Sequence, residues 1–324
     1  MKTSCLKFLL AALAALLALT AQAQNYPDRA ITFVVGWAPG GSTDVMSRLI
    51  GAKLTERLGQ TILIVNRPGA TGTIGARFAA GEKPDGYTFY YGTNSTYALA
   101  PWLYKSLPYD FNEAFEPVSF VGAMPMIVGV HPNVPAKTMR ELVDLAKKSA
   151  RKLTFGSSSP GATSHVAAEL LMQNAGFEMI HVPYKGGGPA LTAILAGEID
   201  LLFNDVTTFE PHINTGKVRA LAATSGARLP NMPNLPTVAE SGLPGFEVST
   251  TNAVFVPKGT PAAAVERFRA ALVAVLSEPT MGQELLRRGM LVQHSTPAEL
   301  GATVRREQQM WKTLLQSRGI TLGQ

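Results

Sequence analysis

Thiol chemistry is nearly absent from this chain of 324 residues, because its single cysteine, Cys5, lies close to the N-terminus. Beyond that position the chain has no disulfide, no cysteine nucleophile and no thiolate metal ligand. Charged residues are also few, at 16% of the chain, and Lys and Arg form no cluster with interleaved aromatics. A nucleic-acid partner, which requires a concentrated basic face, is therefore not expected.

Long apolar runs are missing except at the N-terminus, where Phe8 to Leu19 follow Lys2 and Lys7 and precede Ala21-Gln22-Ala23. This order of a basic start, an apolar run and a small-x-small site predicts a signal peptide over residues 1–23, cleaved near Ala23, and export to the periplasm. The run is shorter than the roughly 20 residues that span a bilayer. An uncleaved membrane anchor is the alternative.

Net charge and length set two further limits. Removing Lys2 and Lys7 from the 29 basic residues leaves 27, which against 23 acidic residues gives a net charge of +4. Such a weakly positive field favours encounter with anionic solutes. The remaining length of roughly 300 residues exceeds what one hydrophobic core usually serves, so two domains are expected.

Short β-branched runs alternate along the chain with longer segments of helical periodicity, which predicts an α/β fold with mixed, mainly parallel sheets and helices on both faces. Strands are predicted at 31–35, 62–65, 88–91, 126–130, 153–155, 180–182, 199–203, 221–223 and 254–256. Helices are predicted at 45–58, 139–150, 164–175, 189–196, 262–276 and 297–317.

The loop between the first strand and the first helix is rich in glycine. In open α/β sheets ligands collect at the carboxyl ends of strands, where loops lead into helix N-termini. Gly40 and Gly41 allow close backbone approach, and Ser42 or Thr43 precedes a helix whose free N–H groups suit a carboxylate. A tight capped turn without a ligand remains the alternative.

Uncharged polar loops follow other predicted strands, at Thr93 to Thr96 and at Ser157 to Ser164. Their hydroxyls and amides can hold a carboxylate without a paired arginine. Tyr184 is a candidate pocket wall, and Asn204 and Asp205 are candidates for binding an amino or hydroxyl group, although an Asp at a strand end also serves as a helix cap. The loop at 66–75 lacks a dinucleotide or phosphate-loop spacing and is predicted to be structural.

A secreted hydrolase is the rival class. The serines at 157–159 lack the nucleophile-elbow glycines. His165 and Glu169 have the i,i+4 spacing of metal ligands, but two ligands do not complete a site. We therefore predict no catalytic residue, no metal and no cofactor.

Five segments together resemble the tripartite tricarboxylate transporter receptor family, the periplasmic Bug-type solute-binding proteins. They are Pro39-Gly40-Gly41-Ser42-Thr43-Asp44, Asn66-Arg67-Pro68-Gly69-Ala70, Lys83-Pro84-Asp85-Gly86-Tyr87, His181-Val182-Pro183-Tyr184-Lys185-Gly186 and the stretch from Leu235 to Gly245. One departure is Ser249-Thr250-Thr251-Asn252, where the family often has an aromatic residue.

The resemblance implies a Venus-flytrap architecture, with residues 24–124 plus 250–324 forming one domain, 125–249 the other, and the ligand cleft between them. It implies a monomer that captures a small di- or tricarboxylate, acidic amino acid or aromatic acid for the membrane subunits of a tripartite transporter, or else a co-receptor for a sensor. The implied ligand-binding residues are Trp37, Pro39, Gly40, Gly41, Ser42, Thr43, Asp44, Thr93, Ser95, Thr96, Ser157, Ser158, Ser159, Thr163, Ser164, Tyr184, Asn204 and Asp205.

Overall fold

The computed structural model describes residues 26–321, so the expected signal peptide, residues 1–23, lies outside the described residues. The strands are β1 (Ile31–Val35), β2 (Ile62–Asn66), β3 (Thr88–Thr93), β4 (Phe115–Val130), β5 (Thr154–Ser157), β6 (Ile180–Pro183), β7 (Leu201–Asp205), β8 (Arg219–Ala223), β9 (Ser249–Pro257) and β10 (Leu291–Val292).

The helices are α2 (Ser42–Leu58), α3 (Thr73–Ala80), α4 (Ala100–Leu103), α5 (Phe111–Ala114), α6 (Met139–Lys148), α7 (Thr163–Ala175), α8 (Gly187–Leu195), α9 (Val206–Asn214), α10 (Ala262–Leu276), α11 (Pro279–Arg287) and α12 (Pro297–Arg318). Two short turns, η1 (Ala70–Gly72) and the π-helical η2 (Ser95–Leu99), complete the set. Within residues 26–321, every helix is too short or too polar to cross a membrane.

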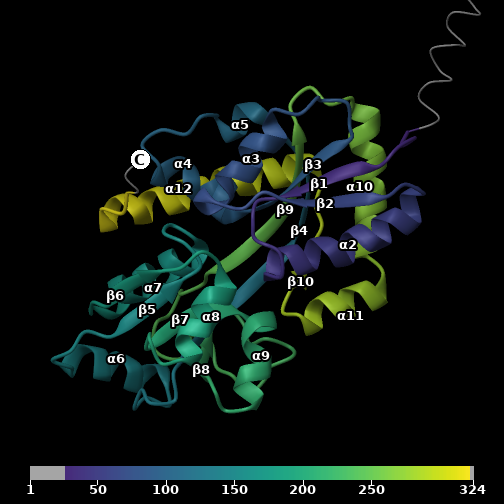
Figure 1. Cartoon of the computed structure of the whole chain (residues 1–324). Coiled ribbons are helices and arrows are strands. Elements are labelled where there is room, and N and C mark those ends of the chain that lie inside the picture. Colours follow the sequence, from purple (N-terminus) through teal and green to yellow (C-terminus); the bar gives the residue numbers. More distant parts are fainter. Residues whose placement is uncertain (1–25, 322–324) are drawn as a thin grey trace, which may run out of the picture.

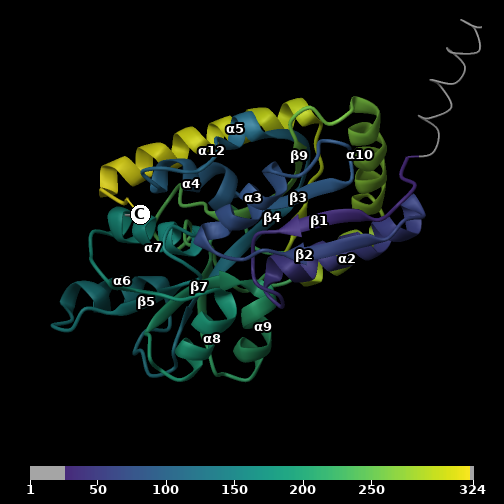
Figure 2. The same ribbon diagram turned by 45° about the horizontal axis from the view of Figure 1, so that its top comes forward.

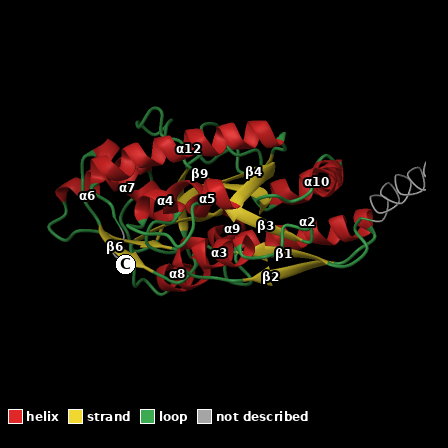
Figure 3. Cartoon of the chain, turned by 90° about the horizontal axis from the view of Figure 1, so that it is seen from above, coloured by secondary structure: helices red, strands yellow, loops and turns green. Residues whose placement is uncertain are grey.

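The strand β1 is buried on both sides, because its side chains alternate between two cores. Ile31, Phe33 and Val35 pack with residues of α2, α10 and α11. Val34 points the other way and packs with residues of α3 and α12. Helices therefore cover both faces of the sheet, as the sequence predicts, and Figure 3 shows α12 running along one side of it.

The long strand β4 belongs to two groups of strands. From Phe115 to Pro125 it pairs antiparallel with β9, which continues to β3, β1 and β2. From Met126 to Val130 it pairs with β7 and β8, and β7 continues to β5 and β6. Figure 1 shows the second group, with α6 to α9, gathered at the lower left. The change of partner at Pro125 and Met126 is thus the point where one strand joins the two groups.

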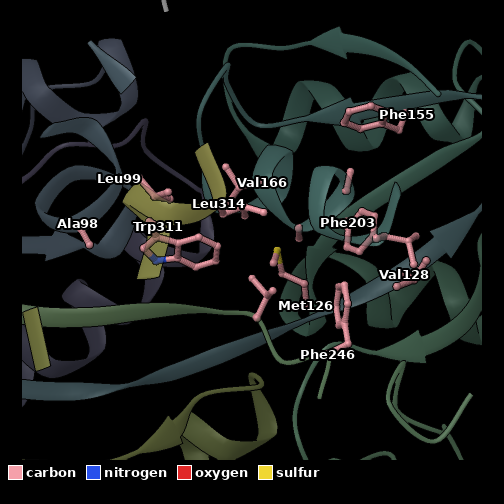
Figure 4. Close-up of a cluster of buried hydrophobic side chains, with 14 of the residues drawn as sticks. Ala98, Leu99, Met126, Val128, Phe155, Val166, Phe203, Phe246, Trp311 and Leu314 are labelled. Atoms are coloured by element: carbon pink, nitrogen blue, oxygen red, sulfur yellow. The ribbon is translucent and has the colours of Figure 1, made fainter. Parts of the chain in front are cut away.

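The C-terminal helix α12 spans the two groups on one side. It packs against α4, η2 and β4 and also against α7. Figure 2 shows α12 along the top of the molecule. Its Trp311 and Leu314 share one hydrophobic core with Val166 of α7 and Phe203 of β7 (Figure 4). Burying such side chains stabilises the fold by roughly 1.5–3 kcal/mol each.

The predicted α/β class is confirmed, and the sheet is mixed, but its antiparallel share is larger than expected. β1–β2, β1–β3, β5–β6 and β5–β7 are parallel. The pairs of β4 with β7, β8, β9 and β10, and the pair β3–β9, are antiparallel. The reason is that β4 carries the chain out of the first group and β9 returns it in the opposite direction.

Candidate functional site

A cavity of about 490 Å³ lies where the loops after β1, β3, β5, β6 and β7 meet. These loops follow the carboxyl ends of strands from both groups, which is where open α/β sheets bind ligands. Of the residues expected at a ligand site, those that line the cavity are Trp37, Pro39, Gly40, Gly41, Ser42, Thr43, Thr93, Ser95, Ser158, Thr163, Ser164, Asn204 and Asp205. Its size suits a small organic molecule.

The glycine loop before α2 is held in shape by Asp44, which is buried and does not line the cavity. Its carboxylate accepts hydrogen bonds from the Gly40 amide at 2.9 Å, from Arg48 Nε at 3.0 Å and from Asn66 Nδ2 at 2.9 Å. Burial alone would raise the pKa of Asp44, but these bonds outweigh it and lower the pKa. Asp44 therefore shapes the loop from behind.

Trp37 forms one wall of the cavity in a fixed orientation. Its indole Nε1 donates to Thr93 Oγ1 at 3.1 Å, which ties the loop after β1 to the end of β3. Its main-chain carbonyl accepts from Asn66 Nδ2 at 3.0 Å. The ring thus presents a half-buried aromatic surface that is positioned before any ligand arrives.

The serine loop, residues 157–164, crosses from the second strand group to touch the first. Thr163 Oγ1 donates to Asn94 Oδ1 at 2.9 Å, and the Thr163 amide donates to Ser95 Oγ at 3.1 Å. Within the loop, the Ser158 amide donates to Ser164 Oγ at 3.1 Å. These bonds hold the hydroxyls of the loop in one arrangement at the cavity wall.

Asp205 makes a direct bond across the cavity. Ser42 Oγ, at the start of α2, donates to Asp205 Oδ2 at 2.5 Å. The other carboxylate oxygen, Oδ1, is buried without a partner within the described part of the chain. Burial raises the pKa of Asp205 to about 6, against the opposing effect of the Ser42 hydrogen bond. A carboxyl from one strand group therefore meets a hydroxyl from the other.

Four helices begin at the cavity without a side-chain cap. α2, α7 and α8 start after Gly41, Ala162 and Gly186, and Asp205 before α9 makes no capping bond. Away from the cavity, α6 and α12 are capped by Thr138 and Thr296, whereas α3, α10 and α11 also begin without a side-chain cap. Although the Thr163 amide at the start of α7 is used by Ser95 Oγ, the four N-termini turn the positive ends of their helix dipoles towards the cavity, an arrangement that favours anions.

Other expected site residues lie behind the cavity wall. Thr96 is buried and donates to the Thr71 carbonyl at 2.8 Å. Ser157 is fully buried beside His181, and Ser159 bonds to Thr71 Oγ1 at 3.2 Å. Tyr184 packs against the apolar cluster of α8 and α9 and does not line the cavity.

Sequence reasoning missed part of the wall. The residues that it did not single out are Ala38, Met126, Lys185, Gly186, Gly187, Gly188, Pro189, Leu191, Leu202, Phe203, Thr208, Pro211, His212 and Thr250. Lys185 to Pro189 directly follow Tyr184, and the three consecutive glycines where α8 begins were a usable signal. Met126 and Thr250 give none, because they reach the cavity only through strand pairing, Met126 opposite Asp205 of β7 and Thr250 opposite Met124 of β4.

The candidates for an enzyme were the His165–Glu169 pair, as metal ligands, and the serines at 157–159, as nucleophiles. His165 Nε2 lies 3.4 Å from Glu169 Oε1, and Arg318 holds the other oxygen of that carboxylate at 2.8 Å. Residues 26–321 contain no cluster of three or more His, Cys, Asp or Glu side chains that could hold a metal ion. Ser157 Oγ lies 2.6 Å from His181 Nε2, but it has no exposed surface from which to reach a substrate.

Comparison with known proteins gives consistent matches over nearly the whole chain. The model of the tripartite tricarboxylate transporter family receptor matches residues 46–320. The protein BugT of Bordetella pertussis is 32% identical over 301 residues, which are 93% of this chain and 92% of BugT.

Two solved structures are also similar. Rpa4515 of R. palustris with adipate has a TM-score of 0.89 and 32% identity, and the match covers 92% of this chain and 100% of that one. MatC of Rhodopseudomonas palustris with bound malate has a TM-score of 0.83 and 32% identity, and the match covers 90% of this chain and 100% of that one.

Proposed function

Because the chain belongs to the tripartite tricarboxylate transporter receptor family, whose members are solute receptors and not enzymes, we propose that it captures a small carboxylate. It does so in the periplasm, after cleavage of a signal peptide over residues 1–23, and delivers the solute to the membrane subunits of a tripartite transporter. Relatives with adipate and with malate support a carboxylate as the ligand class.

The observation that carries this proposal is the meeting of four uncapped helix N-termini at one cavity. A carboxylate placed there accepts hydrogen bonds from main-chain amides and from hydroxyls such as Ser158 Oγ, each worth roughly 1.5–3 kcal/mol before desolvation. Three or four such bonds suffice for a micromolar complex, about −8 kcal/mol. The exposed Lys185 adds a positive charge to the wall.

Much of the remaining wall is apolar. The apolar residues of the wall are Trp37, Met126, Leu191 and Phe203. They suit a ligand that needs polar contacts at only one of its ends. Asp205 would repel a carboxylate placed beside it, because like charges at close range are unfavourable. A ligand with one carboxylate at the helix N-termini and an apolar or hydrogen-bond-donating remainder therefore fits this wall better than a tricarboxylate.

Binding is proposed to close two domains, residues 24–124 with 250–324 and residues 125–249, over the ligand. Two features support this division. β4 changes partner between Pro125 and Met126, and β9 begins at Ser249, opposite Pro125. The two chain segments that would connect the domains therefore lie side by side. The bond between Ser42 and Asp205 then joins the two domains directly on the ligand side.

A thermal-shift screen of the chain without residues 1–23 tests the proposal. The panel contains benzoate, adipate, malate, aspartate and citrate, since a ligand that binds only the folded state raises the melting temperature. We expect a concentration-dependent rise with at least one acid and the smallest effect with citrate. A flat response to the whole panel, repeated by titration calorimetry at millimolar concentrations, would contradict the proposed function.

A further inference from the structure

Two histidines are stacked directly behind the serine loop. The rings of His165, on α7, and His181, on β6, lie 3.9 Å apart with an interplanar angle of 10°. Phe155 of β5 stacks on the other side of His181, with ring centroids 4.8 Å apart. Neither histidine lines the cavity, but both contact the loop that does.

The first histidine is bound in one tautomer. The Gly161 amide, in the middle of the serine loop, donates to His165 Nδ1 at 3.0 Å, so this nitrogen is an acceptor. The proton is then carried by Nε2, which faces Glu169 Oε1 at 3.4 Å. Since Arg318 holds Glu169 in turn, the ring of His165 is fixed by contacts on both of its nitrogens.

The second histidine holds the beginning of the loop. Ser157 Oγ donates its single proton to the Ser159 carbonyl at 3.0 Å. His181 Nε2, 2.6 Å from the same oxygen, is therefore the donor in the bond between the two side chains. In this way His181 fixes the first residue of the loop and His165 fixes its fifth, Gly161.

We propose that His181 is a positioning residue of the binding site, which together with His165 holds residues 157–164 in the shape that presents Ser158, Thr163 and Ser164 to the ligand. It does not touch the ligand. The alternative role, a Ser157–His181 catalytic pair, has no geometric support, because Ser157 is fully buried and already donates its proton to a carbonyl.

The proposal has a pH consequence. The charged and titratable groups around His181 are His165 and Glu169 on α7, with Arg318 on α12 and Glu178 behind them. Burial, and then repulsion by His165, lowers the pKa of His181 to about 4, while Glu169 opposes the shift. Since the ordinary pKa is 6.5, the neutral His181 ring contributes its full stabilisation of the folded state above that pH, and this contribution is lost as the pH falls towards 4.

Two substitutions separate the roles of the ring. His181→Gln places an amide nitrogen near the position of Nε2, so it keeps a donor for Ser157 and loses the titration. His181→Phe keeps the stack and loses the donor. His131→Phe, on a histidine of the same strand group that bonds to the Asn133 amide, is the matched control.

The experiment measures the affinity for malate and for adipate by calorimetry between pH 4 and 8, together with hydrogen exchange of residues 157–164 without ligand. We expect His181→Phe to bind about tenfold more weakly, the loss of one hydrogen bond of roughly 1.4 kcal/mol, and to exchange faster in the loop. His181→Gln should restore the affinity at pH 8 and remove the part of the pH dependence that His181 causes.

The ligand arm rests on the proposed function, whereas the exchange arm does not. If wild-type protein binds neither acid, the proposed function fails for these probes, and exchange in the loop still decides the role of His181. Unchanged exchange in His181→Phe, with an affinity and pH profile equal to those of wild type and of His131→Phe, would overturn the proposal.

Discussion

Replacing Asp205 by Asn should stabilise the protein at neutral pH although it removes a charged partner of Ser42. Burial raises the pKa of Asp205 from 3.8 to about 6, so the folded state holds its proton more tightly than the unfolded state. Stability is therefore lost as the pH rises from 3.8 through 6, and this loss is complete near pH 7. Asn is uncharged at every pH and still offers an oxygen to Ser42 Oγ.

The magnitude follows from the pKa. A rise from 3.8 to about 6 corresponds to roughly 3 kcal/mol of ionisation free energy, at 1.36 kcal/mol for each pH interval of one. Asp205 is only 9% exposed, so solvent screening reduces this value little. At pH 8 the unfolding free energy of Asp205→Asn should exceed that of wild type by about 2–3 kcal/mol, and below pH 4 the difference should vanish.

Urea unfolding at pH 4, 6 and 8 measures this difference directly, with Asp144→Asn on the exposed face of α6 as the control for loss of a surface carboxylate. The control should change stability by less than about 0.5 kcal/mol. Parallel pH profiles for wild type and Asp205→Asn would refute the reasoning, because they would mean that Asp205 has the same proton affinity in both states.

Three further changes have defined outcomes. Gly41→Val should weaken malate or adipate binding about tenfold or more in calorimetry, because Gly41 lines the cavity. The melting temperature should change little, because a Cβ at this position has only ordinary contact distances, and Gly282→Val on α11 is the control. Gly72→Ala should lower the unfolding free energy by several kcal/mol in urea, because its Cβ would overlap Thr96 Oγ1 and its φ is +84°. Burial raises the pKa of Glu307 to about 7, so wild type should lose at most about 3 kcal/mol of unfolding free energy as the pH rises from 4.5 to 7. Glu307→Gln carries no charge at any pH and should not show this loss.

Much of the fold was predictable where local pattern and burial agree. The apolar run of β1 and the periodicity of α10 gave correct bounds, because both elements bury one continuous apolar surface. The first half of β4 was not predicted, since Pro117, Gly122 and Pro125 interrupt its pattern. These residues are accommodated at register shifts and at the change of partner strand, which only the assembled sheet reveals.

The candidate site was predictable as a set of loops but not as a set of contacts. Glycine and serine loops after strands indicate where a ligand binds, whichever strands are neighbours. Ser157 contacts His181 and does not face the cavity. This direction depends on the parallel register of β5 and β6, which pairs Phe155 with His181. The direction of Tyr184 likewise depends on packing against α8 and α9, which no single loop sequence specifies.

Asp205 in the cavity wall and His181 behind the serine loop respond to pH in opposite directions. Asp205 becomes charged as the pH rises through about 6, and His181 becomes charged as the pH falls through about 4. Between these values both side chains are neutral, and the helix N-termini and Lys185 then act on an anion in the cavity without opposition from Asp205. Above pH 6 the charge of Asp205 opposes that potential, and a ligand gains most by placing a hydroxyl or ammonium donor on that side. The same carboxyl therefore links its hydrogen bond with Ser42, which we propose joins the two domains, to the choice of ligand.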